Sequence, residues 1–249
     1  MIRKLLIVFA SGLLLAIVSL GGAWAVGGPA FMQHVKAEGW DADRDVDGGD
    51  GRSPDGPGRV RTLVFDGDRA LTIAMPVSLR FRRGTTSEMT VSGSPNAVDA
   101  VEWKDGRLSL RGGVHSYHDL HVTITAPRLV GLVLDAPGSV DLDDLDQPSF
   151  TLKTHGPAQV DASGKVGKLA IAAQGPADID MADLAATDAT VRVDGVGNVD
   201  ITASGTVDAE LNGVGNVTLH RKPARLTSRT NGIGGIRHEY DGANETDPR

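Results

Sequence analysis

Four aspartates recur at a nearly constant spacing in the second half of the chain. They are Asp141, Asp161, Asp180 and Asp200. Each follows a valine or isoleucine and precedes an apolar or small residue, so on extended strands all four would point outward to the same side. Clustered carboxylates on one face could bind a cation or act as general acid and base on a polysaccharide.

A simpler interpretation is that the four aspartates are solvated side chains that discourage unwanted strand pairing. No lysine, arginine or histidine recurs beside them in the repeated segment, and no aromatic residues form a wall for a sugar ring. This interpretation is favoured, and the aspartates are kept as candidate binding residues.

Other catalytic patterns are weak or absent. His115, His118 and His121 have the spacing H-x2-H-x2-H, but on a strand that starts at Leu120 only His121 would belong to the strand. There is no G-x-S-x-G segment, no cysteine, and no glycine loop followed by a lysine that opens a helix. The sequence therefore predicts no catalytic residue, no metal site and no cofactor.

The composition limits the partners and leaves one feature to explain. A formal net charge of −7 argues against nucleic acid, and an aromatic content of 4% leaves few rings for stacking on bases or sugars. The 32 glycines follow no Gly-X-Y period and are too dispersed for a single linker. Tightly turned repeats would account for them.

The first 26 residues are typical of an export segment. Arg3 and Lys4 precede an apolar run from Leu5 to Leu20, and Ala23-Trp24-Ala25 is an A-x-A-like cleavage site. The uncharged stretch from Leu5 to Val35 also exceeds the roughly 20 residues that span a bilayer. Residues 1–26 are thus either a cleaved signal peptide or a retained membrane anchor, and both place the rest in the periplasm or cell envelope.

Two further segments are too polar and too rich in glycine to build a core. Residues 27–59 are predicted to form an acidic, glycine-rich linker, and residues 241–249 a disordered tail. The folded domain is therefore expected between residues 60 and 240.

The first part of that domain, residues 60–125, consists of short segments with alternating apolar residues. Examples are Leu71-x-Ile73 and Leu79-x-Phe81, and period two is typical of strands. Asp105-Gly106 favours a tight hairpin turn. No sustained helical period occurs after residue 36, so these residues are expected to form irregular first coils of an all-β domain.

Residues 126–240 contain an internal repeat of about 19 residues. Its anchor positions are separated by 20, 19, 20, 18 and 19 residues: Val140, Val160, Ile179, Val199, Val217 and Ile236. Short repeats that cannot bury an apolar face alone are typical of a solenoid. The sequence predicts a single-stranded, right-handed parallel β-helix, in which residues 126–240 form six regular coils.

Glycines mark the turn in nearly every copy of the repeat. The predicted turn glycines are Gly138, Gly156, Gly175, Gly195, Gly197, Gly213, Gly215, Gly232 and Gly234. A sharp corner requires positive φ, and neighbouring coils only ~4.8 Å away leave little room for a Cβ.

Several of these segments resemble a known family. Gly-Val-Gly-Asn-Val at 195–199 and 213–217, Asn-Gly-Ile-Gly-Gly-Ile at 231–236 and the segment 119–129 are similar to the bacterial family known as putative auto-transporter adhesin, head GIN domain. The resemblance covers roughly residues 60–240. It implies an exported β-helical protein with a surface-adhesion role and supplies no catalytic motif. The turns at 155–158 and 174–177 depart from the family pattern, with proline and alanine replacing glycine.

We therefore expect a non-enzymatic, exported envelope or cell-surface protein that binds an unidentified envelope polymer or protein. An uncleaved N-terminal segment would add contact with the membrane. Two alternatives remain open: a polysaccharide lyase or hydrolase that uses the aspartates, and a scaffold that self-assembles end to end as a homo-oligomer. The basic, acid-free segment 221–238 is interpreted as a polar cap on the last coil, with contact to an anionic polymer or lipid as the alternative.

Overall fold

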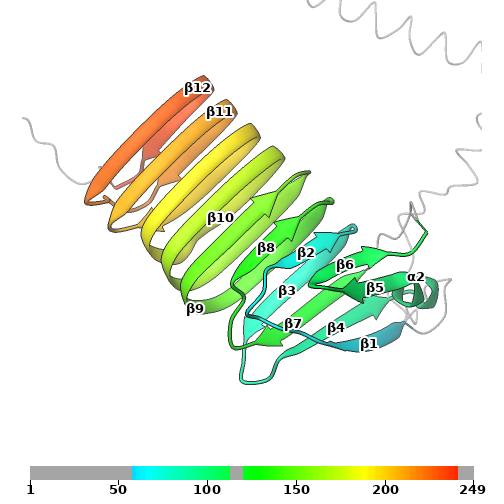
Figure 1. Ribbon diagram of the computed structural model, residues 1–249. Coiled ribbons are helices and arrows are strands. Elements are labelled where there is room, and N and C mark those ends of the chain that lie inside the picture. The colour runs from blue at the N-terminus through cyan, green and yellow to red at the C-terminus, as the bar shows by residue number, and fades with distance from the viewer. Residues whose placement is uncertain (1–57, 113–119, 241–249) are drawn as a thin grey trace, which may run out of the picture. The chain divides into compact units, whose positions relative to one another are not determined.

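The computed structural model describes residues 58–112 and 120–240. They form a parallel β-solenoid of about six turns, with shorter strands and one short helix at its N-terminal end (Figure 1). The predicted all-β, parallel β-helical fold is confirmed. The predicted export segment, most of the predicted linker and the predicted tail lie outside the described residues.

The longest strands are the last four of the chain. In order they are β1 (Arg59–Val64), β2 (Leu71–Ala74), β3 (Val77–Arg83), β4 (Glu88–Gly93), α2 (Pro95–Ala100), β5 (Val101–Lys104), β6 (Arg107–Leu110), β7 (His121–Ala126), β8 (Gly131–Leu134), β9 (Gly138–Thr154), β10 (Ala158–Ala203), β11 (Thr206–Leu219) and β12 (Arg225–His238). The last four are long because strand pairing continues around the corners of the coils. Within the described ranges, no helix is long and apolar enough to span a membrane.

The coils stack in the register that the repeat predicts. Residues opposite each other in adjacent coils are register partners, and Val160 is the register partner of Val140. Val217 has Val199 on one side and Ile236 on the other. The 19-residue repeat therefore corresponds to one turn of the solenoid.

The spatial order of the first coils differs from their order along the chain. β2 lies between β8 and β6, and β3 lies between β9 and β7, all in parallel. The coil of residues 71–83 is thus inserted between residues 107–126 and residues 131–154. β4 and β1 then continue the sheet from β7 in antiparallel fashion, and β5 pairs antiparallel with β6.

The core is a narrow stack of aliphatic columns. Leu132, Leu152 and Ile171 form one such column, and each is at most 2% exposed. Two buried polar side chains contrast within this core. Gln147 is fully satisfied, since it bonds to the backbone of Leu129 and Ser149. Thr154 is 0% exposed, and its Oγ1 has no hydrogen-bond partner among the described residues.

Candidate functional site

The predicted aspartates lie on one outward column of the solenoid, but they do not share one environment. Asp161 is the register partner of Asp141, whose other register partner is Arg80 on β3. Asp200 is followed in the column by Thr218 and then Arg237. The column is therefore flanked by arginines at both ends.

Arginines of β3 neutralise the carboxylates of the first turn of β9. Arg80 Nη2 donates to Asp141 Oδ2 at 3.0 Å. Further ion pairs in this group are Arg82–Asp143 at 3.5 Å, Arg83–Asp144 at 2.9 Å and Arg83–Asp146 at 3.0 Å. All of these side chains are exposed, so the pairs set local charge more than stability. No sequence pattern connects Arg80 with Asp141, because 61 residues separate them along the chain.

The next coils carry carboxylates that form no ion pair within the described part of the chain. These are Asp161, Asp178, Asp180 and Asp183. Asp161, Asp180 and Asp183 line a shallow depression of about 210 Å³, with Arg80 at its edge. Partial burial raises the pKa of Asp161, and the nearby charges of Asp141, Asp180 and Asp178 raise it further. The depression therefore has a net negative charge.

Asp200 differs from the three aspartates before it because histidine lies beside it. His220 Nε2 is 3.3 Å from Asp200 Oδ1, and His220 Nδ1 is 3.1 Å from Glu239 Oε2. The imidazole thus bridges two carboxylates near the C-terminal end. Of the four predicted aspartates, only Asp161 and Asp180 belong to the group that forms no ion pair with a described residue.

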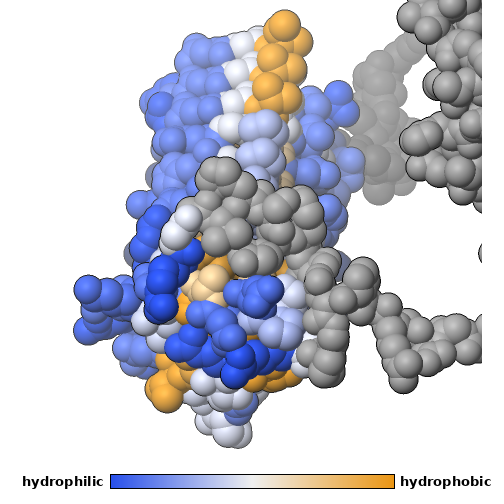
Figure 2. Space-filling view, turned by 90° about the vertical axis from the view of Figure 1, so that its right-hand side faces the viewer, coloured by the Kyte–Doolittle hydropathy of each residue, from blue (hydrophilic) through white to orange (hydrophobic). Residues whose placement is uncertain are grey.

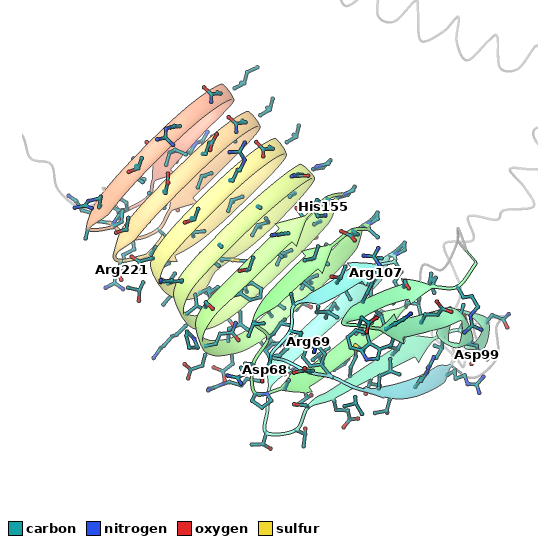
Figure 3. The ribbon with its side chains drawn as sticks, viewed as in Figure 1. Asp68, Arg69, Asp99, Arg107, His155 and Arg221 are labelled. Atoms are coloured by element: carbon teal, nitrogen blue, oxygen red, sulfur yellow. The ribbon has the colours of Figure 1, made fainter. Side chains whose placement is uncertain are left out.

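A second charged cluster lies at the corner where β8 ends. Asp135 accepts hydrogen bonds from Arg107 Nη1 at 2.7 Å and pairs with His155 Nδ1 at 2.8 Å; both partners are labelled in Figure 3. Burial alone would raise the pKa of Asp135, but hydrogen bonds from Arg107 and His155 outweigh it and lower the pKa. Arg107 and Asp135 lie on either side of the inserted coil of residues 71–83, and His155 lies one coil beyond Asp135, so the cluster links coils across the solenoid.

Histidine, aspartate and glutamate side chains are the ones in this protein that could hold a metal ion. In residues 58–112 and 120–240, no group of three or more histidine, aspartate or glutamate side chains is placed to hold a metal ion. His121 is exposed on β7, while His115 and His118 lie outside the described residues.

The corner glycines have a structural role that differs between coils. At Gly197, φ is +155° and a Cβ would lie 1.7 Å from the carbonyl oxygen of Ala177. The same close approach recurs at Gly215, against the carbonyl of Gly197. The predicted positive φ does not occur at four of the turn glycines, and a Cβ at one of them, Gly156, would have ordinary contacts; the four are Gly138, Gly156, Gly195 and Gly232. The corner therefore excludes a side chain in the C-terminal coils but not at Gly156.

The residue between the corner glycines points to solvent and forms an apolar ridge. Val214 is the register partner of Val196 in the coil before it and of Ile233 in the coil after it. The exposed fractions of Val196, Val214 and Ile233 are 56%, 44% and 74%. Figure 2 shows hydrophobic surface gathered in a ridge along one end of the solenoid. Amide ladders flank it, with Asn216 bonded to Asn198 at 3.2 Å and Asn231 to Asn212 at 2.9 Å. This ridge was not predicted from the sequence, although the apolar middle residue of each Gly-x-Gly turn is the signal for it.

Known proteins share both sequence and fold with this chain. Residues 69–223 match the family described as putative auto-transporter adhesin, head GIN domain. The crystal structure of a putative adhesin from Bacteroides fragilis is similar with a TM-score of 0.62 and 19% identity, over 76% of this chain and 100% of its own. A putative adhesin from Parabacteroides merdae matches with a TM-score of 0.37 and 12% identity, over 74% of this chain and 96% of its own. No curated protein is significantly similar.

Proposed function

The chain belongs to the putative auto-transporter adhesin, head GIN domain family, and on this basis we propose that it is an exported, non-enzymatic envelope or cell-surface protein with an adhesin-like binding role. The solenoid supports this role because its outward side chains are ordered at a fixed spacing over several coils. A long, regular face suits a polymer or an extended protein surface better than a small substrate.

One observation supports a choice of face. Asp161, Asp178, Asp180 and Asp183 lie close together on neighbouring coils, and no described basic residue forms an ion pair with them. Of the other carboxylates of the column, Asp141 forms an ion pair with Arg80, and Asp200 lies beside His220. The face is therefore complementary to cationic groups, as found on an amine-bearing envelope polymer or a basic protein surface.

The test is a pull-down of envelope and cell-surface fractions with the immobilised full-length chain. We expect retention that weakens with salt and falls about tenfold in the double variant Asp161→Asn, Asp180→Asn. Asp208→Asn is the matched control, because Asp208 is exposed on β11 with threonines as register partners. No retention at micromolar protein, or equal retention by both variants, would contradict the proposal.

A second candidate is a polysaccharide-active enzyme, because Asp161 and Asp180 line one depression and such enzymes use two carboxyl groups on either side of the scissile bond. Activity on neutral or uronate glycans that disappears in Asp161→Asn and persists in Asp208→Asn would establish it. An inactive wild-type protein across a broad glycan panel would remove it.

Export is tested independently of binding. We expect cell fractionation to recover the protein outside the cytoplasm, and the mass of the mature N-terminus to show whether residues 1–26 are cleaved. Recovery in the cytoplasmic fraction would contradict the proposed location.

A further inference from the structure

The last strand of the solenoid is open on one side. β12 pairs with β11, and no other described strand pairs with it. Ser228 and Thr230 occupy the columns that Ala209 and Leu211 fill one coil earlier, where both residues are 0% exposed. In β12 these positions are exposed. The edge therefore offers backbone hydrogen-bonding groups without a large apolar face.

The charge of this edge is uniform. The segment 221–238 contains no acidic residue, and Arg225 and Arg229 are exposed, with no ion pair to any described residue. They lie on the same straight segment of β12, before the chain turns at Gly232. The open edge is therefore locally basic in a protein whose net charge is −7.

A charge-alternating column ends on one of these arginines. Arg192 Nη1 donates to Glu210 Oε2 at 2.7 Å across adjacent coils. Glu210 is in turn the register partner of Arg229. The signs alternate from coil to coil, so a further strand would complete the pattern with a carboxylate opposite Arg229.

Two residues after Glu210 and Arg229, the side chains of Asn212 and Asn231 form a hydrogen-bonded ladder in which every bond runs in the same direction. Asn212 Nδ2 donates to Asp194 Oδ1 at 2.8 Å, and Asn231 Nδ2 donates to Asn212 Oδ1 at 2.9 Å. Each side chain donates to the preceding coil. The side-chain oxygen Oδ1 of Asn231 accepts no hydrogen bond from the described residues. It is therefore available to accept one from a donor on an added strand.

We propose that residues 225–231 of β12 bind an extended strand of a partner protein, added in parallel to the edge. The partner strand carries a carboxylate opposite Arg229 and, two residues later, an amide donor opposite Asn231. Glu210-Leu211-Asn212 makes the same two contacts one coil earlier, to Arg192 and Asp194. Backbone pairing supplies affinity, and the two side-chain contacts supply specificity.

Other occupants fit this edge less well. A second copy that paired through its own β12 would bring two acid-free, arginine-bearing strands together. A coil with large apolar side chains would find Ser228 and Thr230 where its packing partners should be. The proposed strand concerns a surface separate from the aspartate face, so it goes beyond the proposed function.

The test uses a fluorescent peptide with the sequence of residues 206–212, TVDAELN, titrated with the full-length chain and followed by anisotropy. We expect saturable binding, and about tenfold weaker binding when lysine replaces the glutamate of the peptide. In Arg229→Glu the preference should reverse, so that the lysine peptide binds more tightly. Lys168→Glu, an exposed charge reversal elsewhere on the solenoid, should keep the wild-type preference.

Three outcomes would overturn the proposal. They are no saturable binding below about 1 mM protein, equal binding of the two peptides to the wild-type chain, and a dimer in sedimentation that Arg229→Glu dissociates. The last outcome would assign the edge to a second copy. If Arg229→Glu unfolds, Arg229→Gln serves instead and should make the two peptides bind about equally. The pull-down with Asp161→Asn and Asp180→Asn probes the aspartate face, not the edge of β12. The binding role of that face and the strand binding at β12 can therefore be refuted independently of each other.

Discussion

Asp161 lies one coil beyond Asp141 as its register partner, yet only Asp141 forms an ion pair with a described arginine. The two neighbouring carboxylates therefore differ in their electrostatic environment, because Asp141 has a positive charge beside it and Asp161 does not. Burial, Asp141, Asp180 and Asp178 raise the pKa of Asp161, in that order.

Asp161→Asn is expected to stabilise the protein at neutral pH by a few tenths of a kcal/mol, because it removes like-charge repulsion on a partly solvated face. A raised folded-state pKa means that stability falls as pH rises from 3.8 through the raised value. The gain should therefore vanish in acid, where the carboxyl is protonated. Thermal midpoints measured against pH check this, with Asp208→Asn as control; a destabilised variant at neutral pH would refute it.

Asp135→Asn should show the opposite pH dependence. Hydrogen bonds from Arg107 and His155 lower the pKa of Asp135, so its contribution is present above 3.8 and is lost as pH falls through the lowered value. At neutral pH we expect a loss of about 1 kcal/mol in the free energy of unfolding. Urea unfolding at neutral and acidic pH measures it. An equal loss at both pH values would show that charge is not the cause.

Gly197→Ala should destabilise the solenoid by about 3 kcal/mol or more, since the new Cβ would overlap a carbonyl at a φ that alanine avoids. Gly156→Ala is the control, a turn glycine of an earlier coil where the Cβ has ordinary contacts and φ is not positive. It should change stability by less than about 1 kcal/mol. Chemical denaturation compares the two, and similar losses would reject steric exclusion as the reason for Gly197.

Thr154→Val should stabilise the protein by about 1 kcal/mol, because it replaces a buried hydroxyl without a hydrogen-bond partner by a methyl group of similar size. Thr154→Ser keeps the hydroxyl and removes the methyl group, so it should destabilise. The free energies of unfolding of the two variants give the comparison. A less stable valine variant would mean that the hydroxyl is satisfied in solution.

Ile73→Ala tests the insertion of the coil of residues 71–83. Ile73 is 0% exposed and has Leu134 and Leu108 as register partners, so the substitution should cost about 2 to 5 kcal/mol. Val64→Ala is the control, because Val64 on β1 is 83% exposed. Denaturant unfolding of both variants measures the loss in the free energy of unfolding. A loss below about 1 kcal/mol would argue against the inserted position.

The sequence alone determined the regular part of the fold. Period-two apolar residues predicted strands, and the recurrence from Val140 to Ile236 predicted both the solenoid and its register. This was possible because each coil contacts the coil that follows it in the chain, so the spacing of apolar and glycine residues directly reflects contacts between coils.

Only the tertiary structure decided the arrangement at the two ends. Arg80 reaches Asp141 across 61 residues because the coil of residues 71–83 is inserted out of chain order, and no local spacing encodes such a contact. At the other end, the sequence predicted a polar last coil, but strand pairing is what makes β12 an open edge and puts Arg229 and Asn231 on it. Charge and exposure at these positions depend on which strands are neighbours, and that depends on long-range packing rather than on periodicity.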